Sequence, residues 1–323
     1  MRPVHRVPAE IRGDGKTKGS EDSITTGDCD PATFDANSTR FEILDENVQY
    51  TDKLLGGNGL TGGVDPIGAH LRSGTRLVHG RILLEVGPYE LDWWLPRILG
   101  NANAGDTFET DEVYNLMPFD LMMKRDQGTV IYRHCSVNQA VFRSRASIEG
   151  DEQIMQLGVD IIGYEEHDAT YPVSEPSLPA SDRLYWLLGD GALTLDGTEY
   201  YFDAFNLAIN NNLLPQTRNF LNITCLQSQG RSIKLQVSTP YTSDSHTDLY
   251  ISRFDGPGVL NFLGTKNLTG TPSGYVTTFT FARLIQTRQT PATRGHGEIP
   301  LSLDLEAFRT SVAEPIVVTN TIA

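Results

Sequence analysis

The sequence has little cysteine, a shortage of basic charge and no long apolar run, and each shortage argues against a class of protein. Its three cysteines, Cys29, Cys135 and Cys225, cannot all pair within one chain, which argues against a disulfide-stapled secreted domain. Lys and Arg number 26 against 41 Asp and Glu, so the formal net charge is -15. We therefore expect no surface that grips nucleic-acid phosphates tightly, although nucleic acid can still slide past such a protein.

Long apolar segments are also absent. No run of about 18 apolar residues is present, so we expect no membrane span. The first 20 residues include basic side chains but lack the apolar core of a secretory signal. With 323 residues, of which 39% are hydrophobic, the chain can form one large β domain or two smaller ones.

Motifs that carry chemistry are scarce. No G-x-S-x-G is present, and none of the seven histidines stands in H-E-x-x-H spacing. The glycines of Gly57–Gly62 fit G-x-G-x-x-G, but Pro66 breaks the helix that this dinucleotide motif requires. Acidic residues within 165–168 are typical of a solvated linker. We therefore predict no enzyme activity, no catalytic residue, no cofactor and no metal site.

Alternation of apolar and polar residues is the clearest pattern that is present, and it is strongest between Gly191 and Thr239. A period of two is typical of a strand with one buried face. Asp196-Gly197 supplies a hairpin turn at the start of this stretch. We therefore predict an antiparallel sheet with one wet and one dry face. The apolar positions that indicate it are Phe205, Leu207, Ile209, Ile233, Leu235 and Val237.

Other segments extend this β pattern. Residues 76–86 and 299–306 are predicted strands, and helical spacing predicts a short helix over 88–100 that Gly100 ends. Residues 101–115 and 165–182 are predicted to be loop and linker, and residues 243–254 a second short helix. The order strand, turn, long strand, loop, long strand occurs at 119–162 and again at 191–239, with an offset of 69 residues. This order suggests two copies of one unit.

These patterns divide the chain into four segments. We expect an N-terminal arm over 1–75, a first β unit over 76–175, a second over 176–310 and a C-terminal arm over 311–323. The two arms lack a self-contained core, so they are predicted to order mainly by contact with other subunits. Deletion of residues 1–40 is accordingly expected to leave the β domain folded.

The order of elements resembles the major tail tube protein of long-tailed bacteriophages. The likeness rests on RILLEVGPYELDWWLPRILG, on LTLDGTEYYFDAFNLAINNNL and on GHGEIPLSLDLEAF, and it covers about residues 76–310. It implies a mainly β fold: an antiparallel β-sandwich or barrel of tail-tube type with short flanking helices. It also implies stacked rings of this chain in the virion, assembled in the host cytoplasm, that join other tail proteins at the tube ends and conduct genomic DNA without binding it specifically.

Two questions stay open at this level. A ring of six units is supplied by three chains if the two strand units are copies, and by six chains if they are parts of one domain. A glycan-binding β-sandwich is the alternative function, with Trp93, Trp94, Tyr200, Tyr201 and Phe202 as its aromatic platform.

The wet faces of the predicted strands are the candidate lumen surface of the tube. We predict that some of them line the channel and that the channel is net negative, since a weakly repulsive wall suits rapid DNA transit. Lys234 is the one basic residue included. The other candidate residues are Ser136, Asn138, Gln156, Asp160, Asn206, Asn210, Gln236, Asp304 and Glu306.

Overall fold

The structure is a computed structural model of the chain. It describes residues 8–12, 39–56, 71–102, 106–110, 116–125, 128–146, 151–169, 185–216, 225–240, 253–264, 274–287 and 300–321. The helices in these ranges are α1 (Pro88–Leu99) and the short 3₁₀-helices η3 (Asp151–Gln153) and η4 (Leu188–Asp190). The strands are β1 (Pro8–Arg12), β2 (Thr39–Glu46), β3 (Gln49–Gly56), β4 (Leu71–Glu85), β5 (Gly100–Ala102), β6 (Thr107–Thr110), β7 (Phe119–Arg125), β8 (Gly128–Arg145), β9 (Gln156–Gly163), β10 (Glu165–Ala169), β11 (Gly191–Leu195), β12 (Thr198–Tyr200), β13 (Ala204–Asn210), β14 (Leu213–Gln216), β15 (Cys225–Ser228), β16 (Ser232–Pro240), β17 (Asp255–Leu263), β18 (Val276–Thr287), β19 (Pro300–Ala307) and β20 (Ile316–Thr321).

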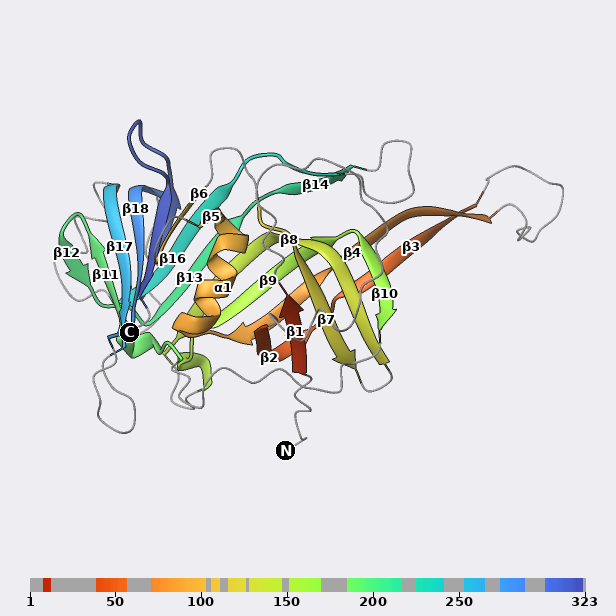
Figure 1. The fold of residues 1–323 in the computed structure, drawn as a ribbon. Coiled ribbons are helices and arrows are strands. Elements are labelled where there is room, and N and C mark those ends of the chain that lie inside the picture. The colour runs from red at the N-terminus through yellow and green to blue at the C-terminus, as the bar shows by residue number, and fades with distance from the viewer. Residues whose placement is uncertain are drawn as a thin grey trace.

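The predicted fold class is confirmed, because the described residues are mainly β, with one large antiparallel sheet of 18 strands, a separate pair formed by β14 and β15, and a single α-helix. At its centre six strands lie side by side in the order β4-β9-β8-β13-β16-β19. Figure 1 shows β4, β9, β13 and β16 crossing the molecule diagonally, with α1 in front of them. We call this part the central sheet.

One face of the central sheet is apolar and carries the core. Phe205, Leu207 and Ile209 on β13 are at most 3% exposed, which confirms the strand and the face predicted from alternation. The sheet curls at β18, which pairs with β19, and a second layer formed by β17 and β18 packs against this face. Phe142 on β8 lies 5.6 Å from Phe279 on β18 between ring centroids. The result is a sandwich of two sheet layers.

Near the N-terminal half, six strands pair in a closed cycle. β1 pairs with β2 and β7, β2 pairs with β4, and β4, β9, β8 and β7 complete the cycle. Such closure leaves no unpaired strand edge within the cycle. On α1, Trp94 is fully buried, with its ring 5.9 Å from Phe41 of β2 and 5.7 Å from Phe119 of β7.

The predicted helix over 88–100 is confirmed as α1, and both of its ends are held by asparagines that lie far away in the sequence. Gly100 follows the last turn in the left-handed conformation, at φ 96°, that glycine adopts without strain. Asn211 donates to the carbonyl of Ile98, and Asn320 of β20 donates to the carbonyl of Pro88. These bonds fix α1 between the central sheet and the C-terminal strand.

The terminal arms differ from the sequence prediction. β2 and β3 place part of segment 1–75 in the sheet of the same chain, with Phe41 and Ile43 buried in its core. β20 pairs with β18 and β6, so the prediction that the C-terminal segment orders mainly through other subunits is wrong for residues 316–321. Local composition does not show that these strands pair within the same chain, because their partners lie far away in the sequence.

Two predicted connections also contain strands. Residues 165–169 of the predicted linker form β10, which extends β9 along the same edge of β8. Residues 107–110 of the predicted loop form β6, which pairs with β20. The glycine motif at 57–62 lies outside the described residues, as does most of the predicted helix over 243–254.

The two predicted strand units have similar pairings but opposite directions. β8 pairs with β9, and β13 pairs with β16, as expected of corresponding strands. However, β8 and β13 are antiparallel neighbours, so any correspondence between them is a two-fold rotation within the sheet. Rotation about the axis of a ring preserves strand direction. The repeat therefore gives no support to pseudo-six-fold symmetry.

Candidate functional site: the polar face of the central sheet

The second face of the central sheet is a broad polar surface. Strand alternation places on it the residues opposite to those of the core. Their cross-strand pairings align them in four rows, and we call this surface the polar face. Its residues are Arg81, Leu83 and Glu85 of β4; Gln156, Gly158 and Asp160 of β9; Gln139, Val141, Arg143 and Arg145 of β8; Ala204, Asn206, Ala208 and Asn210 of β13; Ser232, Lys234, Gln236 and Ser238 of β16; and Ser302, Asp304 and Glu306 of β19.

A row of hydrogen-bonded side chains crosses this face. On β8, Arg143 donates from both Nε and Nη2 to Oε1 of Gln156, at 3.2 and 3.0 Å. Further along the row, Asn206 donates to Gln236 at 3.2 Å, and Gln236 donates to Asp304 at 2.9 Å. The row thus holds two hydrogen-bonded groups, Arg143 with Gln156 and Asn206 with Gln236 and Asp304, and within each group the side chains are held from one strand to the next.

A second row begins with an ion pair. Arg81 Nε lies 3.8 Å from Oδ1 of Asp160. The Arg81 guanidinium extends over Gly158, where a Cβ atom would stand only 2.4 Å from Arg81 Nη2. Glycine at 158 therefore leaves the space that Arg81 occupies. Partial burial raises the pKa of the Asp160 carboxyl, and the charge of Arg81 opposes that rise.

The structure brings seven of the nine predicted surface residues to the polar face. The other two differ because a β-bulge between Val137 and Gln139 shifts the register of β8. Ser136 is only 8% exposed. Asn138 is the extra residue of the bulge, and its side chain accepts a hydrogen bond from the Leu213 amide. The seven residues are Gln156, Asp160, Asn206, Asn210, Gln236, Asp304 and Glu306, and Lys234 joins them.

Most of the basic charge on this face was not predicted from the sequence. Beyond the bulge, alternation on β8 resumes with the opposite phase and brings Arg143 and Arg145 to the surface. Among the residues that define the polar face, four are basic (Arg81, Arg143, Arg145 and Lys234) and four acidic (Glu85, Asp160, Asp304 and Glu306), for a formal net charge of zero. The expected excess of acid is therefore absent from this surface.

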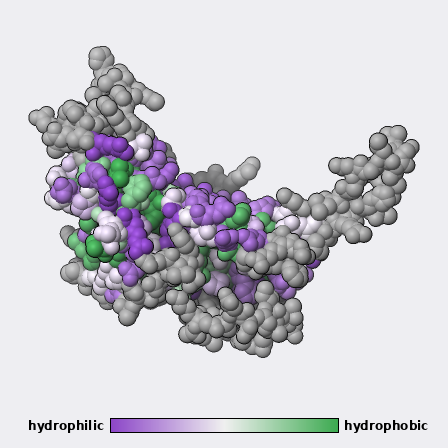
Figure 2. Space-filling view, turned by 90° about the horizontal axis from the view of Figure 1, so that it is seen from above, coloured by the Kyte–Doolittle hydropathy of each residue, from purple (hydrophilic) through white to green (hydrophobic). Residues whose placement is uncertain are grey.

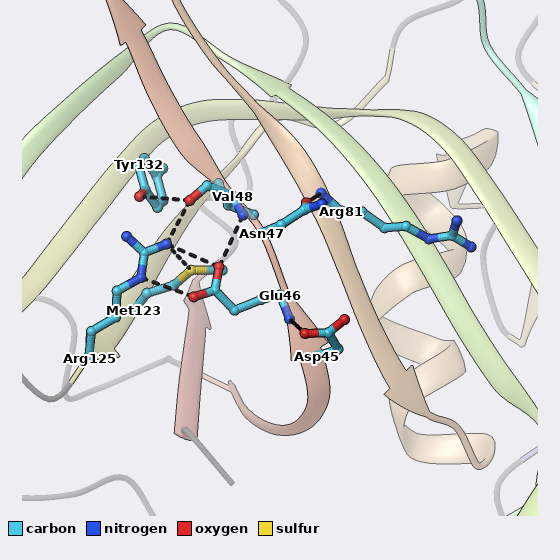
Figure 3. Close-up of polar contacts among 8 residues, drawn as sticks. All are labelled: Asp45, Glu46, Asn47, Val48, Arg81, Met123, Arg125 and Tyr132. Atoms are coloured by element: carbon cyan, nitrogen blue, oxygen red, sulfur yellow. Dashed lines mark hydrogen bonds and ion pairs between the residues drawn. The ribbon is translucent and has the colours of Figure 1, made fainter. Parts of the chain in front are cut away.

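Beside the polar face, the long hairpin of β3 and β4 projects from the body of the molecule (Figure 1). Its base is the turn between β2 and β3, which side chains of β7 and β8 hold (Figure 3). Arg125 donates to both carboxylate oxygens of Glu46 at 3.0 Å and also to the Val48 carbonyl. The Tyr132 hydroxyl donates to the same carbonyl, and burial raises the pKa of Tyr132 to about 12.

Close backbone packing completes this base. A Cβ atom at Gly80 of β4 would lie 2.4 Å from Cα of Val48, so only glycine permits the approach. Asn47 Oδ1 accepts a hydrogen bond from the Arg81 amide on the same strand. The turn between β2 and β3 is therefore fixed to β4, the strand that also contributes Arg81 to the polar face.

The aromatic residues of the alternative function are not assembled into an exposed platform. Trp94 is fully buried, Tyr200 is 7% exposed and Phe202 packs against Phe205, whereas Tyr201 is 83% exposed. Seen from above, the described surface is mostly hydrophilic, and its apolar residues gather toward the end that holds β17 and β18 (Figure 2).

The described ranges contain no group of three or more metal-binding side chains. No helix within them is long and apolar enough to cross a membrane. Cys135 is fully buried, and burial raises the pKa of its thiol.

The described residues thus form a β-sandwich with an extended polar face. A family model described as phage tail tube protein matches residues 58–307. Because this match covers well over half of the chain, the chain belongs to the phage tail tube protein family, as its resemblance to tail tube proteins predicted. It is a structural component of the bacteriophage tail. A search of curated proteins gave no match.

Proposed function

We propose that this chain assembles into stacked rings whose polar faces line the channel that conducts phage DNA into the host. The observation that carries the proposal is the polar face itself, a six-stranded surface with neutral net charge and side chains held in rows. DNA that passes such a wall meets few sites of strong attraction, and the core on the opposite face supports the wall. The rings form in the host cytoplasm and end against other tail proteins.

Strand number favours three chains in each ring. With β3 beside β4 at the edge of the central sheet, seven strands of each chain form the wall, so three chains supply 21 strands. At a spacing of about 4.8 Å and a tilt of about 40°, 21 strands close with a backbone diameter of roughly 42 Å. Under the same assumptions 42 strands, from six chains, give roughly 84 Å. A channel that guides one duplex needs to be only slightly wider than the duplex, so the smaller ring fits better.

Unpaired strand edges supply the joints between subunits. In the described pairings, β3 has β4 as its one partner, and residues 300–303 of β19 have a partner on one side only. Such edges recruit strands of a second chain when nothing covers them. We propose that these two edges meet in neighbouring subunits, and that segment 1–75 supports stacking through its projecting hairpin.

Negative-stain imaging of the purified protein tests assembly. Rings or filaments with a central channel are the expected result. A protein that remains monomeric at high concentration in physiological buffer contradicts the proposal. A small closed oligomer that binds glycans favours a sugar-binding module instead.

A further inference from the structure

The two arginines of β8 stand apart from the other charges of the polar face. Arg143 and Arg145 alternate on one strand, so their Cα atoms lie about 6.7 Å apart and their side chains leave the same face. Both residues are exposed. The polar-face positions directly opposite them are Gln156, Asn206 and Ala204, none of which is acidic.

No acid of the polar face stands directly opposite this arginine pair. Arg81 has Asp160 as its ion-pair partner, and Lys234 stands opposite Glu306. The other acids in the row of Arg143 are Glu85, two strands away, and Asp304, three strands away in the other direction. Those separations are roughly 10 and 14 Å, beyond the Debye length of about 8 Å at physiological salt. No carboxylate of the described residues forms an ion pair with Arg143 or Arg145.

The guanidinium of Arg143 is also oriented in advance. Gln156 accepts from its Nε and Nη2 atoms, which leaves Nη1 for another acceptor. Small neighbours on β13, Ala204 and Ala208, leave space above the sheet beside the pair. A planar guanidinium held in this manner binds the oxygens of a phosphate or carboxylate with less loss of side-chain freedom.

We propose that Arg143 and Arg145 form a basic band around each ring that contacts the phosphate backbone of DNA in the channel. This proposal rests on the proposed function, since it needs the polar face to line the channel. Ring symmetry repeats the pair at equal angles around the axis. Duplex DNA matches such a band because it carries one charge per about 1.7 Å of axis and presents phosphates in every direction. A protein with an acidic surface fits the band less well than DNA, because it contacts only some subunits of the ring.

The band lets an overall neutral wall exert a weak hold on DNA at one level of each ring. Each phosphate contact with a basic side chain displaces a counterion. The binding constant of one contact therefore falls roughly in inverse proportion to the salt concentration. The hold therefore slows DNA passage most at low salt and fades at high salt. It also centres the duplex, because contacts act from all sides of the ring.

The test uses the phage that encodes this chain, with Arg143→Gln and Arg145→Gln combined in its tail tube. Genome release is timed by the fluorescence of a DNA-binding dye at about 50 mM and about 500 mM salt. We expect the variant to eject on the order of two- to fivefold faster at the lower salt and at the wild-type rate at the higher salt. Arg283→Gln with Arg309→Gln is the matched control, since it removes two exposed arginines that lie outside the polar face.

Each other outcome has a defined meaning. If intact variant tails eject DNA at the wild-type rate at both salt concentrations, the proposed basic band is overturned. Tails that are absent or altered in length also overturn it, because the pair then contacts another tail protein or a second subunit during assembly. Wild-type protein that forms no tube refutes the proposed function instead, and electron micrographs of the same preparations separate these cases.

Discussion

Adjacent residues of β8 illustrate how differently the two faces of the central sheet are determined. Phe142 is fully buried and contacts Phe279 of the second layer, whereas Arg143 is exposed and held by one glutamine. The apolar face is fixed by the free energy of burial, which tolerates few alternatives. The polar face tolerates many side chains with little loss of stability, so its charges are available for function. The predictions below test this division.

The largest expected effect is a loss of stability on the apolar face. Replacement Phe142→Ala removes a buried ring and leaves a cavity, so the free energy of unfolding should fall by about 3–5 kcal/mol. Arg143→Gln on the next residue should change it by less than about 0.5 kcal/mol. Urea denaturation of the two variants measures both values. Similar losses from both replacements contradict the division between the faces.

A smaller loss is expected at the base of the projecting hairpin. Glu46 and Arg125 form a bidentate pair, but the Arg125 side chain is 37% exposed, so water screens part of the attraction. A double-mutant cycle with Glu46→Gln and Arg125→Gln should give a coupling energy of about 1 kcal/mol. The coupling should weaken at high salt. A coupling energy of zero shows that the Val48 contacts hold the turn without this pair.

A charge change on the polar face should affect DNA passage more than folding. Replacement of Asp160 and Glu306 by lysine adds basic charge beside Arg81 and Lys234. Tails should still assemble, but DNA ejection should slow on the order of twofold at low salt, where attraction is least screened. Timing of genome release measures this effect. Unchanged ejection from correctly assembled tails contradicts a channel position for these two residues.

The smallest effect concerns pH. Burial raises the pKa of Asp160 above its ordinary value near 3.8, so the folded state favours the protonated carboxyl. Stability is therefore lost as the pH rises from the ordinary pKa through the raised one, and it is regained on acidification. Asp160→Asn should remove this contribution and flatten the stability profile just above pH 3.8. Parallel profiles of variant and wild type rule out the contribution.

Local alternation was enough to predict most of the central sheet. Leu207 and Leu235 alternate with polar neighbours on β13 and β16, and the structure buries both. The same alternation identified seven of the nine candidate residues on the polar face. Gly100 also marked the end of α1, because its position required a left-handed residue.

Features that depend on distant partners could not be predicted in this way. The bulge at Asn138 reverses the alternation of β8. The polar residues predicted on this strand ended at Asn138, so Arg143 and Arg145 were not among them. The alternation that restarts at Gln139 was the available signal. β10, with the sequence EEHDA, has the composition of a charged linker and becomes a strand because β8 offers it a free edge. Backbone pairing can therefore override local composition.

The central claim is that the polar face lines a channel, and a cross-section of assembled tubes by electron cryomicroscopy tests it most directly. The account predicts three chains per ring, with β4, β9, β8, β13, β16 and β19 side by side around the channel and Arg143, Asn206 and Gln236 pointing into it. A map in which these side chains face outer solvent, or in which the central sheet lies away from the channel, contradicts the claim.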